Sequence, residues 1–267
     1  MKTSVKLFFK VVLDFIRRFL IGILATGPIP SHIAYIMDGN RRYEKNHNLS
    51  KGMGHSAGLA SMKKMLKYSY GIGVKYVTVY GFSIDNFKRP AEEVKTLMEL
   101  FQEKIEILTL PGSIVHQLGL RIHFIGNLNL LNSSLRITAE NAMRATAHNN
   151  QTVLLFCISY TSTSEIFHAV QESCSYAANG LIEQEKEIIE LGDIEKRMYM
   201  AVAPEPDIII RSSGETRLSN FLLWQTGKSL LYTTAALWPE VGLGHLVWAV
   251  LAFQRNYSYL HKKVKQV

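Results

Sequence analysis

The sequence predicts an α/β fold with a mostly parallel central sheet of about six strands and helices on both faces. Short β-rich runs alternate with longer helical patterns, and polar loops follow several of the runs. Alternation of this kind is typical of a parallel sheet. Because 47% of the 267 residues are hydrophobic, the chain can bury one full core.

The first thirty residues predict an amphipathic helix. Apolar pairs at positions 7/8, 11/12, 15/16, 19/20 and 23/24 recur at helical spacing, and charged residues interrupt them. The uncharged run from Phe19 to Pro30 is too short to span a bilayer. We expect residues 1–26 to lie on a membrane surface and residues 27–267 to form the main domain. Packing on the body of the protein or its partner, and a signal segment, are the alternatives.

Strands and helices are expected in alternation after residue 27. The strand candidates are His32 to Met37, Lys75 to Phe82, Leu120 to Ile125, Thr152 to Ser159, Asp207 to Arg211 and Ser229 to Tyr232. The helical windows are 55–70, 91–109, 133–148, 163–176, 181–200 and 243–260. In such folds ligands bind beyond the carboxyl ends of the strands, so the loops that follow them are the candidate site.

Charge and cysteine content exclude several classes of function. The net charge is +8, but residues 1–75 carry +10 and the rest −2, a bias that suits anionic lipids or polyanionic ligands. No zinc-finger, bZIP or RNP-like motif is present, so nucleic acid is not an expected partner. Cys157 and Cys174 form no CxxC pair, which predicts two buried thiols and no disulfide or cysteine zinc site.

Three of the predicted strands end in polar loops. These loops read MDGNRRY, GFSIDNFKRP and RSSGETRLSNF. Together they supply five guanidiniums suited to phosphate oxygens, those of Arg41, Arg42, Arg89, Arg211 and Arg217. Neither GxxxxGK[ST] nor GxGxxG is present, so we expect a phosphate pocket of a different construction.

Asp38 directly follows the first predicted strand. An unpaired buried carboxylate is costly, so this side chain is expected to meet cations. It can form a local salt bridge with Arg41 or Arg42, or it can bind Mg²⁺, which prefers carboxylate oxygens together with phosphates and water. The residues alone leave both interpretations open.

A series of ordered motifs runs from about His32 to Tyr259. They are HIAYIMDGNRR, GHSAG, FSIDNFKRP, IIIRSSGETRLSNFLLWQ and LWPE. In these motifs the chain resembles the cis-prenyltransferases, the Z-isoprenyl or undecaprenyl diphosphate synthase-like family, and especially its plant dehydrodolichyl diphosphate synthases. The resemblance implies the Z-prenyl synthase fold. It also implies condensation of isopentenyl diphosphate onto an allylic primer such as farnesyl diphosphate, with a new cis double bond and loss of pyrophosphate.

The resemblance also implies site roles. Asp38 would hold Mg²⁺ against the leaving pyrophosphate, and Asn86, with Ser83, would lie where isopentenyl diphosphate loses a proton. The groups expected to bind the allylic diphosphate are Gly39, Asn40, Arg42 and His55. Those expected to bind isopentenyl diphosphate are Arg89, Arg211, Arg217 and Ser219. Further expected substrate contacts are Tyr43, Lys51 and Phe87.

Simpler structural interpretations remain beside these roles. Asn86 can be a turn residue, and Arg211 and Arg217 can form a surface ion pair with Glu215. The helical window 94–108 carries one apolar face, formed by Leu97, Leu100, Phe101, Ile105 and Leu108. A polyprenyl tunnel and an ordinary core helix share this pattern, so the tunnel assignment depends on the resemblance.

The sequence departs from the homodimeric bacterial members of the family. Thr216 and Leu230 replace two of their magnesium-binding residues, which leaves Asp38 alone among the protein ligands. The family's C-terminal RxG motif is missing, as in eukaryotic two-subunit enzymes that borrow it from a Nogo-B receptor-like, non-catalytic subunit. We therefore expect such a partner, at the cytosolic face of the endoplasmic reticulum membrane. A short-chain synthase and a non-catalytic subunit are the alternatives.

Overall fold

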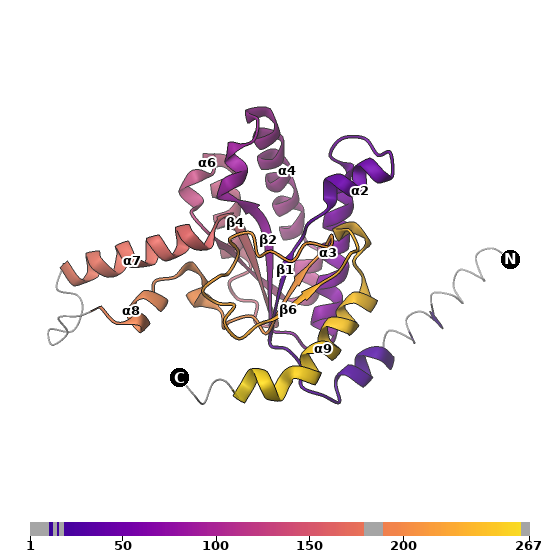
Figure 1. The fold of residues 1–267 in the computed structure, drawn as a ribbon. Helices are drawn as coiled ribbons and strands as arrows, with labels where there is room; N and C mark the ends of the chain where they lie inside the picture. Colours follow the sequence, from indigo (N-terminus) through magenta and orange to yellow (C-terminus); the bar gives the residue numbers. More distant parts are fainter. Residues whose placement is uncertain (1–10, 13–14, 16–18, 179–188, 263–267) are drawn as a thin grey trace.

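The computed structural model describes residues 11, 12, 15, 19–178 and 189–262. Six strands form one sheet in the order β3-β4-β2-β1-β5-β6, and every neighbouring pair in it is parallel (Figure 1). The strands are β1 (His32–Ile36), β2 (Tyr76–Ser83), β3 (Leu120–Ile125), β4 (Thr152–Tyr160), β5 (Ile208–Arg211) and β6 (Leu230–Thr233). The predicted fold class is confirmed, and each strand lies within one residue of its predicted bounds.

Five of the predicted helices are present. They are α3 (Met53–Gly71), α4 (Ala91–Thr109), α6 (Ser133–Ala145), α7 (Ser162–Ala178) and α9 (Leu243–Lys262). Shorter helices that the sequence pattern did not reveal are α2 (Asn40–Asn46), α5 (Ile114–Leu118), η1 (Ile84–Lys88), η2 (Leu128–Leu130) and η4 (Trp238–Glu240). A helix of one or two turns is too short to show a 3.6-residue period.

The prediction of one helix over residues 181–200 is wrong for the described part. Residues 179–188 lie outside the description, and the remainder contains only α8 (Leu191–Glu195) and η3 (Tyr199–Val202). Glu190 and Asp193 form a capping box, which starts a new helix at residue 191. Gly192, the second residue of α8, has low helix propensity and disfavours a long helix through this segment.

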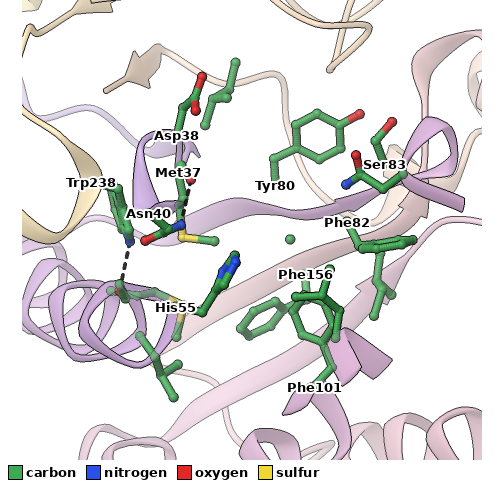
Figure 2. A pocket seen from close by; sticks show the side chains of 18 of the residues that line it. Met37, Asp38, Asn40, His55, Tyr80, Phe82, Ser83, Phe101, Phe156 and Trp238 are labelled. Carbon is green, nitrogen blue, oxygen red and sulfur yellow. Dashed lines mark hydrogen bonds between the residues drawn. The ribbon is translucent and has the colours of Figure 1, made fainter. Parts of the chain in front are cut away.

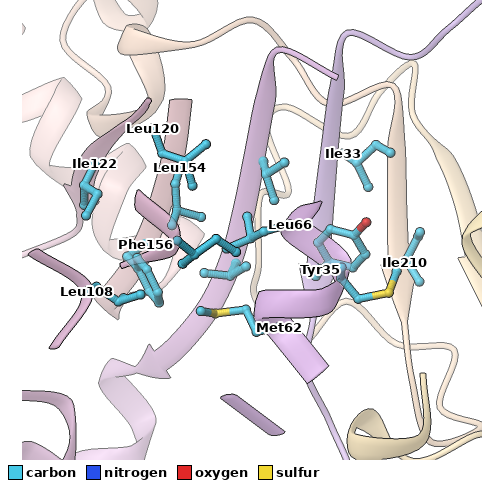
Figure 3. Packing of buried hydrophobic residues seen from close by; sticks show 14 of the residues in the cluster. Ile33, Tyr35, Met62, Leu66, Leu108, Leu120, Ile122, Leu154, Phe156 and Ile210 are labelled. Carbon is cyan, nitrogen blue, oxygen red and sulfur yellow. The ribbon is translucent and has the colours of Figure 1, made fainter. Parts of the chain in front are cut away.

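Two clusters of buried side chains occupy the two faces of the sheet. The larger cluster packs one face against α3, α4, α6 and α9, and Figure 3 shows Met62 and Leu66 of α3 lying over Tyr35, Leu154 and Ile210 of the strands. The smaller cluster packs the other face mainly against η3 and the loop around Phe221 and Leu222. The larger layer also contains the wall of the candidate site.

The described part of the N-terminal segment is helical and is tied to the body of the protein at its end. Residues 11, 12, 15 and 19–24 are helical, Leu24 is buried, and turns follow it, close to the predicted boundary. Gln254 of α9 donates hydrogen bonds to the carbonyl oxygens of Leu24 and Pro28. None of the helices in the described ranges is long and apolar enough to cross a membrane.

The two cysteines do not share one environment. Cys157 of β4 is buried, and burial raises the pKa of its thiol. Cys174 of α7 is exposed, so the prediction of two buried thiols is wrong for this residue. The buried face of α7 is formed by other residues, so Cys174 faces outward even though a cysteine side chain is small and apolar.

His32 joins the start of β1 to two other segments. Its ring is fully buried, with Nδ1 2.7 Å from the Pro204 carbonyl oxygen and Nε2 2.7 Å from Thr78 Oγ1. Nearby, the Asp207 carboxylate accepts hydrogen bonds from the backbone N–H groups of Ser31 and His32. Burial lowers the pKa of His32 to about 4, although the hydrogen bond to Pro204 partly opposes this shift.

We predict that His32 makes the fold sensitive to acid. The unfolded chain binds a proton at this position near pH 6.5 and the native protein only near pH 4, so stability falls as the pH drops through that interval. The loss amounts to about 3 kcal/mol in the free energy of unfolding. Urea unfolding between pH 7 and pH 4 should show a flatter pH dependence for His32→Gln than for the parent. The exposed control His148→Gln should keep the parental slope, and an equal slope in His32→Gln would contradict the prediction.

Candidate active site

The site is built where β1, β2 and β5 end, a region we call the carboxyl edge. These strands are adjacent in the sheet, so the loops that follow them converge although they are far apart in sequence. Arg211 at the end of β5 points to Asp38, with Nη2 2.8 Å from Oδ2, and its side chain is only 6% exposed. Its Nη1 donates to Ser219 Oγ and to the Arg217 carbonyl oxygen. One guanidinium thus joins two of the three loops.

Ser212 provides a second connection between β1 and β5. Its fully buried hydroxyl accepts a hydrogen bond from the Asp38 N–H at 2.9 Å and lies 2.7 Å from the Asp38 carbonyl oxygen. Arg42 extends the connection, because its guanidinium donates to both the hydroxyl and the carbonyl oxygen of Ser213. Both the backbone and the carboxylate of Asp38 are therefore held in place.

The charge of Asp38 is stabilised by its neighbours. Burial raises the pKa of this carboxyl, but the hydrogen bond and charge of Arg211, with smaller contributions from the Gly39 N–H and Arg42, bring it below the usual value. Arg42 lies 3.7 Å from Oδ1, so the predicted salt bridge with Arg42 is present, and the closer partner is Arg211. Asp38 is anionic at neutral pH.

Asn40 is turned into the protein, toward α3. Its Nδ2 donates to the Met37 carbonyl oxygen, while its Oδ1 is buried and has no hydrogen-bond partner among the described residues (Figure 2). A Cβ atom on Gly58 would lie 2.2 Å from that Oδ1, so only glycine lets α3 approach this closely. Trp238 closes the same corner by donating a hydrogen bond to the Gly58 carbonyl oxygen.

The loop after β2 contributes an arginine, an amide and a hydroxyl. Arg89 donates to Asn86 Oδ1 and to Glu93 Oε1, both at 3.0 Å. The same Glu93 oxygen lies 3.6 Å from Arg41, so one carboxylate pairs with guanidiniums from two loops. Ser83 caps η1 by accepting a hydrogen bond from the Asp85 N–H.

His55 lies on the first turn of α3 and points into the cavity (Figure 2). Burial lowers the pKa of its ring, with Glu44 and Glu93 opposing the shift and Arg41 and Arg89 supporting it. The imidazole is therefore neutral at neutral pH and can both donate and accept one hydrogen bond.

The loop after β5 holds an unusual backbone conformation. Ser213, Ser219, Asn220 and Leu222 all have positive φ, between 49° and 76°. Such conformations persist in non-glycine residues only where the surroundings enforce them. Glu165 of α7 supplies part of that support: this fully buried carboxylate accepts hydrogen bonds from Tyr160, Gln225 and the Met200 N–H, all within 3.0 Å.

One cavity of about 780 Å³ connects the carboxyl edge to the apolar core layer. Its polar half contains all but three of the predicted site residues. Those present are Asp38, Gly39, Asn40, Arg42, His55, Ser83, Asn86, Arg89, Arg211, Arg217 and Ser219. Its apolar half is lined by the predicted face of α4, together with Phe82, Phe124, Phe156 and Ile158. In Figure 2, Phe101 and Phe156 lie on the far side of the cavity from Asp38.

Three predicted site residues do not line this cavity. The Tyr43 ring packs at a tilt against His47, with ring centroids 4.1 Å apart, and Lys51 is exposed before α3. Phe87 packs edge-on against Phe82 and so supports the wall from behind.

The sequence reading also missed several lining residues. Arg41 was named only as part of the arginine set, whereas Tyr80, Asp85 and Lys104 were not named as site residues although they line the cavity. Tyr80 lies near the end of β2, so its position in the strand was an available signal. Lys104 lies within the apolar face of α4, and a charged residue at such a position is not predicted to line an apolar wall.

The donor set suits one magnesium ion shared with a ligand. The described residues contain no group of three or more histidine, cysteine or acidic side chains that could hold a metal by itself. Mg²⁺ is commonly bound by one or two carboxylates, with phosphates and water completing the octahedron. Asp38 fits that pattern. Its Oδ2 lies 2.8 Å from Arg211, whereas its Oδ1 lies 3.7 Å from Arg42 and is therefore the oxygen that could bind the ion.

Fold and site together define a family. Residues 36–260 match the prenyltransferase family model described as "Putative undecaprenyl diphosphate synthase", and the chain belongs to this cis-prenyltransferase family. It is 54% identical to the dehydrodolichyl diphosphate synthase CPT3 of Solanum lycopersicum, over 95% of this chain and 94% of that protein. It is 41% identical to the human dehydrodolichyl diphosphate synthase complex subunit DHDDS, over 92% of this chain and 73% of that protein.

A solved structure shares the fold. The crystal structure of lavandulyl diphosphate synthase from Lavandula x intermedia, in complex with dimethylallyl diphosphate, superposes with a TM-score of 0.76. The two sequences are 25% identical, and the match covers 85% of this chain and 95% of that one.

Proposed function

We propose that this protein adds isopentenyl diphosphate units to an allylic primer, with farnesyl diphosphate as the expected one. The product is a long-chain cis-polyprenyl diphosphate of the dehydrodolichyl type, and each cycle releases pyrophosphate. The observation that carries this proposal is the cavity at the carboxyl edge. Guanidiniums line one half of it, and hydrocarbon side chains line the other half. A prenyl diphosphate has the same division, with a charged head and an apolar tail. Membership of the family and the names of its relatives support the same reaction.

The two diphosphate heads divide the polar half between them. Gly39, the N–H groups at the start of α2, Arg42 and His55 would bind the allylic diphosphate. Gly39 has a φ of +102° and leaves no room for a Cβ beside Leu237, so the chain can turn sharply there. Arg89, Arg217 and Ser219 would bind isopentenyl diphosphate. Arg211, whose Nε has no partner among the described residues, would hold Ser219 and the backbone of Arg217 in position for that diphosphate.

Asp38 would hold Mg²⁺ together with the allylic diphosphate. Bound there, the ion would offset the charge that builds on the departing pyrophosphate. The protein's own contribution is to hold both substrates with reacting carbons adjacent and to exclude water from them. Asn86 and Ser83 are weak bases, so we assign them to orienting isopentenyl diphosphate and not to accepting its proton.

Replacement of Asp38 separates catalysis from a supporting role. We predict that Asp38→Ala lowers the rate of condensation by about a hundredfold or more, because Arg211 and Arg42 then lose their partner and the metal loses its protein ligand. The rate of incorporation of radiolabelled isopentenyl diphosphate, measured with the partner subunit present, tests this. Glu99→Gln on the exposed side of α4 is the control. Retained activity in Asp38→Ala would show instead that the chain is a non-catalytic subunit.

We further propose that the chain works with a Nogo-B receptor-like, non-catalytic subunit that supplies an RxG motif. The human relative is named as a subunit of a complex, which supports such an arrangement. The family's RxG reaches the substrate diphosphates, so the partner's motif would contribute to binding of both heads.

Purified alone, the chain should therefore be nearly inactive, and addition of the partner should restore processive synthesis. Chromatography of products from farnesyl diphosphate and radiolabelled isopentenyl diphosphate, with and without the partner, measures this. Full processive activity of the isolated chain would refute the requirement.

Residues 1–26 are proposed to attach the enzyme to the cytosolic face of the endoplasmic reticulum membrane, with 27–267 as the catalytic domain. Val11, Phe15, Phe19 and Ile23 follow one another at four-residue spacing, and their exposed fractions are 61%, 69%, 60% and 46%. A stripe of this kind, with basic residues around it, suits the surface of an anionic bilayer.

We predict that Phe15→Ser combined with Phe19→Ser releases the protein from anionic phosphatidylserine vesicles, because the stripe loses its two aromatic anchors. Leu24 and its contacts with α9 remain, so the catalytic domain stays intact. Vesicle flotation measures the change, and Phe167→Ser, an exposed phenylalanine on α7, is the control. Unchanged flotation of the double variant would place the anchor elsewhere.

A further inference from the structure

The helices that pack on one face of the sheet with the larger buried cluster differ in charge. α4 contains five glutamates and two lysines. α3 contains the lysines Lys63, Lys64 and Lys67 and no aspartate or glutamate, and α9 likewise contains no acidic residue. The part of this helical layer that α3 and α9 form is therefore basic, whereas the part that α4 forms is acidic.

The lysines of α3 are turned away from the sheet. Met62 and Leu66 lie on the buried side of this helix, whereas Lys64 and Lys67 are exposed and Lys63 is partly exposed. Within the described ranges, no ion pair joins any of the three lysines to an acidic residue. Their charges are therefore available to an external anion.

α9 presents aromatic side chains on its outer side. Trp248 is 58% exposed and Tyr259 is 61% exposed. They are eleven residues apart, about three helical turns, so they lie on the same side of α9, with the exposed Arg255 between them. Tryptophan and tyrosine suit the boundary between water and lipid, because each combines an apolar ring with a polar group.

The described N-terminal helix contacts both of these helices, which also contact each other. A Cβ atom on Gly71, at the end of α3, would lie 3.3 Å from Ile21 Cδ1. Gln254 of α9 donates a hydrogen bond of 2.8 Å to the Leu24 carbonyl oxygen, and the two segments lie side by side in Figure 1. The exposed apolar stripe of the N-terminal segment, the lysines of α3 and the aromatic residues of α9 thus belong to three adjoining helices.

We propose that the outer faces of α3 and α9 form a docking surface for an anionic phospholipid bilayer. The proposal rests on the membrane attachment proposed for residues 1–26 and adds a contact made by residues 27–267. The lysines attract anionic headgroups, and the exposed aromatic rings of α9 enter the boundary between headgroups and acyl chains. A soluble polyanion would neutralise the lysines but would leave these rings in water, so a bilayer fits the whole surface better.

The combined replacement Lys63→Gln, Lys64→Gln and Lys67→Gln tests the surface, because it removes three charges at exposed positions. The full chain is mixed with phosphatidylcholine vesicles that contain phosphatidylserine, and the bound fraction is measured by flotation. We expect vesicle binding to weaken by about tenfold or more, since each lysine near an anionic surface adds to the attraction. The binding that remains should also respond less to added salt.

Two control variants separate the charge from its position and from the fold. The combination Lys95→Gln, Lys196→Gln and Lys228→Gln removes the same charge from exposed lysines outside α3 and α9 and should bind as the parent does. Arginine at the three α3 positions keeps the charge and should also give parental binding. Thermal unfolding of each variant confirms that the fold is retained.

Trp248 gives a second measurement that does not depend on the lysines. The chain contains three tryptophans, and Trp238 is only 1% exposed. In a Trp224→Phe variant, Trp248 is therefore the tryptophan that lipid can reach. We expect lipids brominated on their acyl chains to quench its fluorescence in vesicles with phosphatidylserine and not in vesicles of phosphatidylcholine alone.

The outcomes separate this proposal from the others. Parental flotation of the α3 lysine variant, an equal loss in the matched lysine variant, or an unquenched Trp248 would overturn the docking surface. A parent chain that does not float would contradict the membrane attachment itself, before any variant is compared. None of the three α3 lysines lines the cavity, so incorporation of isopentenyl diphosphate in detergent should stay parental, and failure of the proposed reaction would leave the flotation result unaffected.

Discussion

The arrangement of the site depends on the ion pair between Arg211 and Asp38. The arginine is 6% exposed and ends β5, the aspartate follows β1, and the pair fixes the distance between two loops that are far apart in sequence. Because the guanidinium also holds the Arg217 carbonyl oxygen and Ser219, it positions the strained loop after β5. Removing one partner of such a pair leaves a poorly solvated charge, which costs far more than loss of an exposed pair.

Close packing around two glycines fixes the part of the cavity between the end of β1 and the start of α3. Gly39 turns the chain beside Leu237, and Gly58 admits the Asn40 side chain against α3. These contacts set the position of α3 and hence that of His55. The result is a polar half held by hydrogen bonds and close contacts, next to an apolar half lined by α4 and the phenylalanines of the sheet.

The sequence predicted what depends on local pattern and on long motifs. Strand bounds and the span of α4 were predictable because β-rich runs and a 3.6-residue period extend over many positions. The partner of Asp38 was not, because Arg211 is 173 positions away and only the sheet order brings it near. Tyr43 and Phe87 directly follow lining residues in sequence but contact His47 and Phe82, and Lys51 is exposed before α3, so none of the three lines the cavity. Lys104 was overlooked because a long side chain can lie in an apolar face while its charge remains in water.

The other charge pairs at the carboxyl edge have a different character. Arg217 pairs with Glu215, and Glu93 pairs with Arg41 and Arg89, and all of these side chains are partly exposed. Exposed pairs contribute about 0–1 kcal/mol each, so a diphosphate can take over their guanidiniums at small cost. These carboxylates limit repulsion among the five arginines while no substrate is bound. In the proposed reaction the pair of Arg211 and Asp38, whose arginine is buried, would stay intact, and the exposed pairs would exchange their acidic partners for substrate oxygens.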